Sequence, residues 1–213
     1  QEAAKHVKVV LSGEGADELF GGYNIYREPE ALKMVGWIPF EIRRAVGRLA
    51  AKLPDVKGRD FLIRAGKKVE ERFIGNAYIY GEKEKNQILK GGVKGQTTQE
   101  FLKPFYKEIE NDCFLEKTDR TKHTHKVCRI EKKSGRDGLG KSHLQDMEKM
   151  QSVDLNYWLP GDILQKADKM SMAHSLEVRV PFLDKDVWTL AAGLPKEAKI
   201  ADGTTKDIFR KAV

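Results

Sequence analysis

The sequence predicts an α/β fold that is rich in helices, with one strand near the N-terminus followed mainly by helices. Residues 7–11 form a short apolar, β-branched run, which is typical of a buried strand. Residues 12–15, Ser-Gly-Glu-Gly, form a tight turn directly after this run. Beyond the turn, apolar residues recur every three or four positions, which is the period of amphipathic helices. We therefore expect one strand that leads through a small turn into a mostly helical chain.

The element after the turn is predicted to be a short helix at residues 16–20. Asp17 and Glu18 place negative charge in its first turn, where the helix dipole favours it. The later helices follow from apolar periodicity, although Pro104 strains one of them because proline lacks a backbone N–H. A methionine-rich stripe is expected in the core, because methionine fills irregular cores. The predicted helices are 39–53 (with Ile42, Val46, Leu49 and Leu53 on one face), 61–75, 98–110, the stripe of Met147, Met150, Val153 and Trp158 with its continuation at 163–170, and a helix that starts at 204–207.

The turn at residues 12–15 is also a candidate site. In open α/β sheets, ligands bind at the carboxyl ends of strands. Two glycines let the backbone approach a ligand, and N–H groups at a helix start favour phosphate. Nearby acids would repel a polyphosphate unless Mg²⁺ lay between them. Asp17 is then the best candidate for the carboxylate that binds the metal, and Glu14, on the turn itself, is better placed to face the reacting atoms. The alternative is an ordinary strand–helix turn whose acids complement the helix dipole, which an isolated Gly-x-Gly would favour.

Three ordered blocks of sequence carry a resemblance to a known family. The first is residues 9–23, Val-Val-Leu-Ser-Gly-Glu-Gly-Ala-Asp-Glu-Leu-Phe-Gly-Gly-Tyr. The second is residues 154–184, which includes Asp-Lys-Met-Ser-Met-Ala-His-Ser-Leu-Glu-Val-Arg, and the third is Gly-Thr-Thr-Lys at 203–206 with Arg-Lys-Ala at 210–212. Together they resemble the ATP-pyrophosphatase domain of glutamine-hydrolysing asparagine synthetases. The resemblance implies an adenine-nucleotide-alpha-hydrolase-like fold.

The resemblance also implies a reaction that uses ATP and Mg²⁺. The side-chain carboxylate of aspartate attacks the α-phosphate of ATP, pyrophosphate leaves, and ammonia made from glutamine displaces AMP from β-aspartyl-AMP to give asparagine. Ser12 and Gly13 would bind ATP, Glu14 would be the catalytic residue at the acyl-adenylate, and Asp17 would bind Mg²⁺–pyrophosphate.

Two basic residues of the second block are further candidates. Lys169 and Arg179 would offer charge to a phosphate or a carboxylate of the substrate. An equally good interpretation pairs Arg179 with Glu177, because structural ion pairs and binding sites look alike in sequence.

Residues 1–213 are expected to be part of a synthetase domain. The family opens with a catalytic cysteine in a glutaminase domain, whereas residue 1 is Gln and the cysteines are Cys113 and Cys128. The family's Ser-Gly-Gly-x-Asp-Ser loop and its later Arg-x-Lys-x-Gly-Phe stretch are also missing from the sequence. We therefore expect the chain to mark the activity of a longer protein without performing it alone.

The net charge of +7 is concentrated in one stretch. Residues 116–141 contain nine Lys or Arg and four Asp or Glu, with little apolar content, so we expect a basic, flexible insert at 116–143. This distribution argues against a basic nucleic-acid-binding module, the alternative from another class. Cys113, His123, His125 and Cys128 are a weaker zinc candidate, because their spacing matches no common zinc module.

The composition limits the compartment and the partners. Two cysteines in 213 residues fit a reducing cytoplasm, and no apolar run is long enough to cross a membrane. Expected partners are ATP, aspartate and ammonia from the glutaminase domain, and the family allows a homodimer of the full-length protein. A related amidotransferase with another acceptor, one that forms β-lactams or modifies peptides, is the other alternative.

Overall fold

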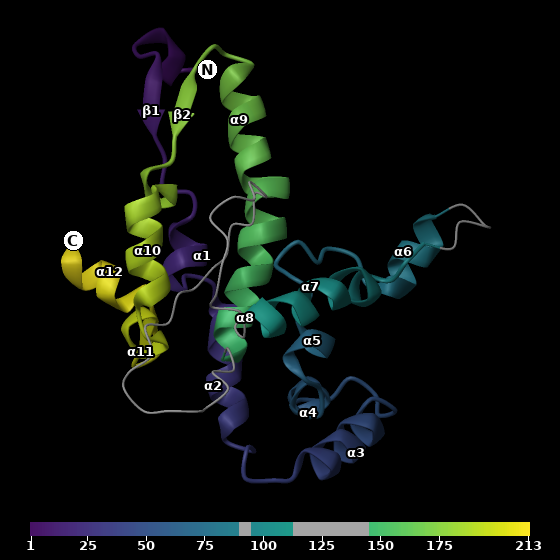
Figure 1. The fold of residues 1–213 in the computed structure, drawn as a ribbon. Coiled ribbons are helices and arrows are strands. Elements are labelled where there is room, and N and C mark those ends of the chain that lie inside the picture. The colour runs from purple at the N-terminus through teal and green to yellow at the C-terminus, as the bar shows by residue number, and fades with distance from the viewer. Residues whose placement is uncertain (90–94, 113–144) are drawn as a thin grey trace. The chain divides into compact units, whose positions relative to one another are not determined.

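Figure 1 shows the computed structural model of the chain, which describes residues 1–89, 95–112 and 145–213. The predicted insert at 116–143 and the cysteine–histidine zinc candidate lie outside the described residues. The described residues form two units: the first comprises 1–26 and 151–213, and the second comprises 27–112 and 145–150 without the gap at 90–94. In these ranges, no helix combines the length and apolar character needed to cross a membrane.

The first unit contains four short strands: the strand predicted near the N-terminus is confirmed, and three further strands were not predicted. Strand β1 (Val9–Leu11) pairs in parallel with β2 (Glu177–Arg179), and Val10 lies opposite Val178. The two strands run side by side in Figure 1. Strands β3 (Ile200–Ala201) and β4 (Thr204–Thr205) form an antiparallel hairpin. Its turn residues Asp202 and Gly203 have φ values of 47° and 75°, as a type I′ turn requires.

The helices of the first unit follow the turn after β1 and the long run that leads into β2. Helix α1 spans Ala16–Phe20, as predicted. The predicted helix start at 204–207 is partly wrong, because residues 204 and 205 belong to β4 and the helix begins at Asp207. The helical elements are η1 (Ala3–Lys5), α1, the π-helix η3 (Asp154–Leu164), α9 (Gln165–Met172), η4 (Pro181–Leu183), α10 (Lys185–Gly193), α11 (Lys196–Lys199) and α12 (Asp207–Ala212).

Three phenylalanines form the centre of this unit's core. Phe20 of α1 stacks on Phe209 of α12 with ring centroids 5.5 Å apart. Phe182 of η4 meets both rings edge-on, at centroid distances of 6.2 Å from Phe20 and 5.2 Å from Phe209. Such offset and edge-on contacts are the favoured geometries of aromatic pairs. Phe20 and Phe182 belong to the first and second blocks, and Phe209 lies between the two parts of the third, so this cluster joins the three blocks. Around it lie Leu19, Leu155, Leu159 and Ala191, with Ile163, Leu164, Leu183, Val187, Trp188, Leu194 and Ile208 partly buried.

The second unit is helical in its described residues. Helices α3 and α4 approach closely at two glycines that leave no room for a side chain. A Cβ at Gly47 would lie 3.0 Å from the carbonyl oxygen of Leu62, and a Cβ at Gly66 would lie 2.6 Å from the carbonyl oxygen of Arg43. Its elements are η2 (Asn24–Arg27), which starts in the first unit, α2 (Glu28–Lys33), α3 (Phe40–Ala50), α4 (Arg59–Ala65), α5 (Val69–Arg72), α6 (Glu82–Ile88), α7 (Thr98–Asp112) and α8 (Asp146–Val153), which ends in the first unit.

The predicted helices of this region are confirmed with corrections. The helix expected at 61–75 is broken into α4 and α5. Helix α7 continues through Pro104. The stripe at Met147, Met150 and Val153 is buried as expected. The apolar face of α3 is exposed, and Met170 in α9 is 69% exposed, although it was expected to continue the core stripe.

Glu18 is a buried carboxylate on α1, only 1% exposed. The Tyr23 hydroxyl donates a hydrogen bond to Glu18 Oε1 at 2.7 Å, and Trp158 Nε1 donates to the Tyr23 hydroxyl at 3.2 Å. Burial raises the pKa of the Glu18 carboxyl above its ordinary value, although the hydrogen bond from Tyr23 opposes this shift. Burial and the hydrogen bond to Glu18 also raise the pKa of Tyr23, so its hydroxyl stays a donor at neutral pH.

We predict that Glu18→Gln stabilises the chain at pH 7–8. A carboxyl whose pKa is raised by folding stabilises most when protonated, and that stability is lost as the pH rises through the folded-state pKa. Glutamine keeps the acceptor for Tyr23 and removes the charge. Thermal unfolding followed by circular dichroism should therefore show a higher midpoint temperature for the variant than for the wild type at pH 7–8. The difference between the two midpoints should disappear toward pH 4.

The matched control is Glu197→Gln, which removes a carboxylate of the same unit that is 70% exposed. This variant should track the wild type at each pH. A Glu18→Gln protein that is less stable than the wild type at pH 8 would show that the charged carboxylate stabilises the fold.

Candidate functional site

The candidate site is the turn that follows β1. Because β1 and β2 are parallel, their carboxyl ends lie together, and Ser12 N donates a hydrogen bond to the Arg179 carbonyl oxygen at 2.8 Å. The turn therefore begins where both strands end. Ser12 and Glu14 are half-buried, whereas Gly13 is exposed and has open space on its Cβ side. A ligand at this edge would reach the Ser12 hydroxyl and the backbone of Gly13.

Gly15 gives the turn its shape. Its φ of 89° lies in the left-handed region, and a Cβ there would overlap the side chain of Leu183. Helix α1 then begins at Ala16, and Leu19 N donates to the Gly15 carbonyl oxygen at 3.0 Å. A glycine is needed because the backbone both turns left-handed and packs directly on the side chain of Leu183.

Glu14 has a buried oxygen without a partner. No described residue donates a hydrogen bond to its Oε2, which is shielded from solvent. A buried polar atom is usually paired, because leaving it unpaired costs about 1–3 kcal/mol. The Glu14 carboxylate is therefore available to a donor group of a ligand.

Asp17 pairs with Lys206, for which the sequence indicated no role. Its Oδ1 lies 2.8 Å from Lys206 Nζ, and the two side chains are 39% and 22% exposed. Lys206 has φ 54°, which is uncommon for a residue with a side chain. A Cβ at Gly22 would overlap Asp17 Oδ1 and Lys206 Cε, so this glycine leaves the room that the ion pair fills. Lys206 thus lies beside Asp17, and its place in the third block was the available signal.

Arg179 lies next to the turn, whereas Lys169 does not. The backbone of Arg179 contacts the turn through Ser12, but its side chain is 65% exposed and its Nε lies 2.8 Å from Glu177 Oε1. The pairing of Glu177 with Arg179 is therefore confirmed. Lys169 is exposed on α9, and within the described ranges no side chain pairs with it or links it to the turn. The structure does not bring Lys169 into the site.

The site was also tested for a divalent cation. Within residues 1–89, 95–112 and 145–213, no three His, Cys, Asp or Glu side chains gather closely enough to hold a metal ion. Mg²⁺ is usually bound by one or two carboxylates together with substrate phosphates rather than by a cage of protein ligands. The partly exposed carboxylate of Asp17 fits that mode of binding.

Comparison with known proteins assigns the chain to a family. The sequence model described as Asparagine synthase matches residues 1–213, the whole chain. The chain belongs to the asparagine synthase family. The relatives with known names agree with this assignment to the asparagine synthases.

Two relatives that align with the whole of this chain are named glutamine-hydrolysing asparagine synthetases. Asparagine synthetase (glutamine-hydrolyzing) 1 of Bacillus subtilis (strain 168) is 42% identical over 213 residues, which are 100% of this chain and 29% of the relative. A putative asparagine synthetase (glutamine-hydrolyzing) of Mycobacterium tuberculosis (strain ATCC 25618 / H37Rv) is 41% identical over 214 residues, which are 100% of this chain and 28% of the relative. The chain thus spans less than a third of the length of either relative. No solved structure matches it.

The geometry of the turn predicts different effects at its two glycines. Gly15→Ala should destabilise the chain by about 2–4 kcal/mol, because alanine is strained at positive φ and its Cβ would overlap Leu183. Gly13→Ala places the same methyl group in open space and should change stability by less than about 1 kcal/mol. Urea unfolding followed by circular dichroism measures both. Equal losses at the two positions would contradict the packing of Gly15 on Leu183.

Proposed function

We propose that residues 1–213 form the part of a glutamine-hydrolysing asparagine synthetase that handles the acyl-adenylate and the leaving pyrophosphate. The observation that carries this proposal is the buried, unpartnered Oε2 of Glu14 at the carboxyl ends of β1 and β2. The names of the relatives that align with the whole chain favour asparagine as the product over a β-lactam or a modified peptide.

The proposed reaction has two steps. In the first, an oxygen of the aspartate side-chain carboxylate attacks the α-phosphorus of ATP, the bond to the β-phosphate oxygen breaks, and pyrophosphate leaves. In the second, the nitrogen of ammonia attacks the acyl carbon of β-aspartyl-AMP, and AMP leaves from the tetrahedral intermediate. The nitrogen must lose a proton as AMP departs, and the first step must stabilise the charge that develops on pyrophosphate.

The turn has groups suited to each demand. The Ser12 hydroxyl and the exposed Gly13 backbone would contact ATP. Glu14 would accept a hydrogen bond from the incoming ammonia through Oε2 and take its proton or stabilise its positive charge. Lys206, held by Asp17 at 2.8 Å, would offer its ammonium group to the pyrophosphate. In this arrangement Lys206 positions Asp17 and adds positive charge where the leaving group is most negative.

Mg²⁺ is proposed as the cofactor. Asp17 would hold it together with the phosphates of ATP, and it would neutralise charge on the leaving pyrophosphate. The support is the partly exposed carboxylate of Asp17 beside the turn. The cytoplasm is the proposed compartment, because the few cysteines suit a reducing environment.

The proposal is tested with Glu14→Gln in a protein of the relatives' full length that carries residues 1–213. Glutamine keeps the size of the side chain and removes its charge and its basicity. The rate of asparagine formation from ATP, aspartate and ammonia should fall about 100-fold or more, the usual scale for losing a general base or an electrostatic group. The affinity for ATP should change little, because Ser12 and Gly13 are unaltered.

Asp17→Asn is the companion variant, and its defect should be partly relieved by raising the Mg²⁺ concentration. Glu197→Gln is the control, because it removes a carboxylate of the same unit that is 70% exposed and contacts none of the described turn residues. Unchanged turnover in Glu14→Gln would return Glu14 to the role of an acid that complements the helix dipole.

A further inference from the structure

The second unit contains a cavity lined mainly by charged side chains. Its volume is about 390 Å³, which is in the range of small-molecule sites. The described segments around it are α3, the residues before and within α5, α7 and α8. The lining residues are Phe40, Arg43, Lys67, Lys68, Val69, Glu70, Arg72, Glu110, Asp146 and Lys149. Five are cations and three are carboxylates, which leaves an excess of two positive charges.

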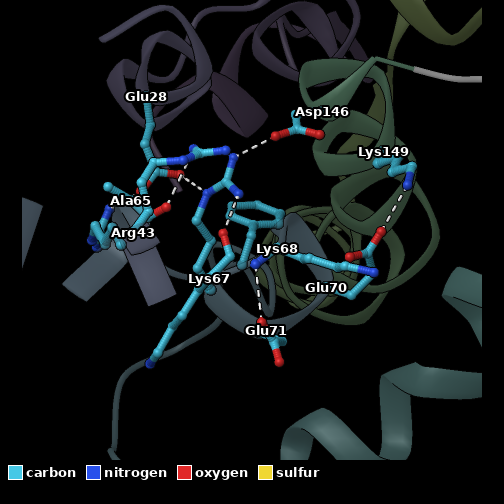
Figure 2. Close-up of polar contacts among 12 residues, drawn as sticks. Glu28, Arg43, Ala65, Lys67, Lys68, Glu70, Glu71, Asp146 and Lys149 are labelled. Atoms are coloured by element: carbon cyan, nitrogen blue, oxygen red, sulfur yellow. Dashed lines mark hydrogen bonds and ion pairs between the residues drawn. The ribbon is translucent and has the colours of Figure 1, made fainter. Parts of the chain in front are cut away.

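Each carboxylate of the lining is already held by a cation. Lys149 Nζ lies 2.7 Å from Glu70 Oε1 and 2.7 Å from Glu110 Oε1. Burial alone would lower the pKa of Lys149, but its hydrogen bonds to Glu110 and Glu70 raise it, so this lysine stays charged at neutral pH. Asp146 Oδ2 lies 2.6 Å from Nη2 of Arg72, whose side chain is 4% exposed. Figure 2 shows the contact of Lys149 with Glu70 and, separately, the contact that Asp146 makes.

Arg43 is a fixed cation without a carboxylate partner. Its Nε donates to the Ile38 carbonyl oxygen at 3.0 Å, and its Nη1 donates to the Ala65 carbonyl oxygen at 3.4 Å. The guanidinium also lies over the Phe40 ring, 5.6 Å from its centroid. These partners fix the orientation of the group and leave its charge unmatched, because in the described part of the chain no carboxylate lies within ion-pair distance of it.

Lys67 and Lys68 also line the cavity, and both residues are exposed. Among the described residues, neither side chain has a carboxylate within ion-pair distance. A planar guanidinium and two mobile ammonium groups match the oxygens of a phosphate group, which accepts several charge-assisted hydrogen bonds.

We propose that this cavity binds a compact phosphate-bearing anion, with Arg43 as the fixed contact and Lys67 and Lys68 as the mobile ones. The anion supplies the negative charge that the lining lacks, since its own carboxylates are held by Lys149 and Arg72. Both the cavity and its residues belong to the second unit. The proposal therefore stands independently of the function proposed for the turn in the first unit.

The experiment titrates the 213-residue chain with sodium pyrophosphate and follows amide and Arg43 Nε–H resonances by NMR. The proposal expects saturable shifts at residues 67–72 and at Arg43 Nε. The double variant Lys67→Gln/Lys68→Gln should weaken the apparent affinity at least five-fold. Arg48→Gln/Lys52→Gln is the matched control, because it removes two exposed cations from and just beyond α3 that do not line the cavity. It should change the affinity less than two-fold.

Two further titrations identify the source of the phosphate. The first uses AMP, which adds a base to the phosphate, and shifts of the Phe40 ring resonances on AMP binding indicate that the ligand is a nucleotide. The second uses inorganic phosphate, and an affinity equal to that of pyrophosphate indicates that the ligand is the free ion. Circular dichroism confirms that the variants remain folded. The proposal is overturned by an absence of shifts at residues 67–72 up to 10 mM pyrophosphate, or by equal losses of affinity in the two double variants.

Discussion

The turn that carries Ser12, Gly13 and Glu14 depends on the packing of Phe20 against Phe182 and Phe209. Helix α1 has only five residues, which is too short to be stable by itself in water. Its position therefore comes from the burial of Leu19 and Phe20 in the core. Because Glu14 lies two residues before the helix, the same packing fixes the location of its carboxylate.

The polar groups of the site follow from this core. Gly15, whose backbone turns left-handed, packs on Leu183, which lies next to Phe182 in η4. Lys206 comes directly before α12, the helix that carries Phe209, so stacking of Phe209 on Phe20 brings the lysine to Asp17. The apolar cluster and the ion pair thus connect the same segments, one in the core and the other at the partly exposed edge. This arrangement explains how motifs far apart in the sequence act at one place.

The sequence predicted the parts of the site that are local. Residues 7–11 and 12–15 indicated a strand and a turn, and α1 was predicted with its observed bounds, because apolar character and glycines act over a few residues. The expectation that the strand is buried was wrong, because Val9 and Leu11 are exposed. Strand β2 was missed because it has only three residues, two of them charged and exposed. The β3–β4 hairpin was also missed, although Asp202-Gly203 is a strong hairpin signal. The contact of Lys206 with Asp17 could not be predicted, because it depends on how distant segments pack.

The central claim is that the first and third blocks are joined through Phe20 and Phe209. A double-mutant cycle with Phe20→Leu, Phe209→Leu and the combined variant measures this directly from the free energies of unfolding in urea. Leucine keeps an apolar side chain and removes the stacked pair. We expect the sum of the two single losses to exceed the loss in the double variant by about 0.5–1.5 kcal/mol, the usual coupling of an aromatic pair. Single losses that add to the double loss within about 0.3 kcal/mol would mean that the two rings do not contact and that the blocks are joined in another way.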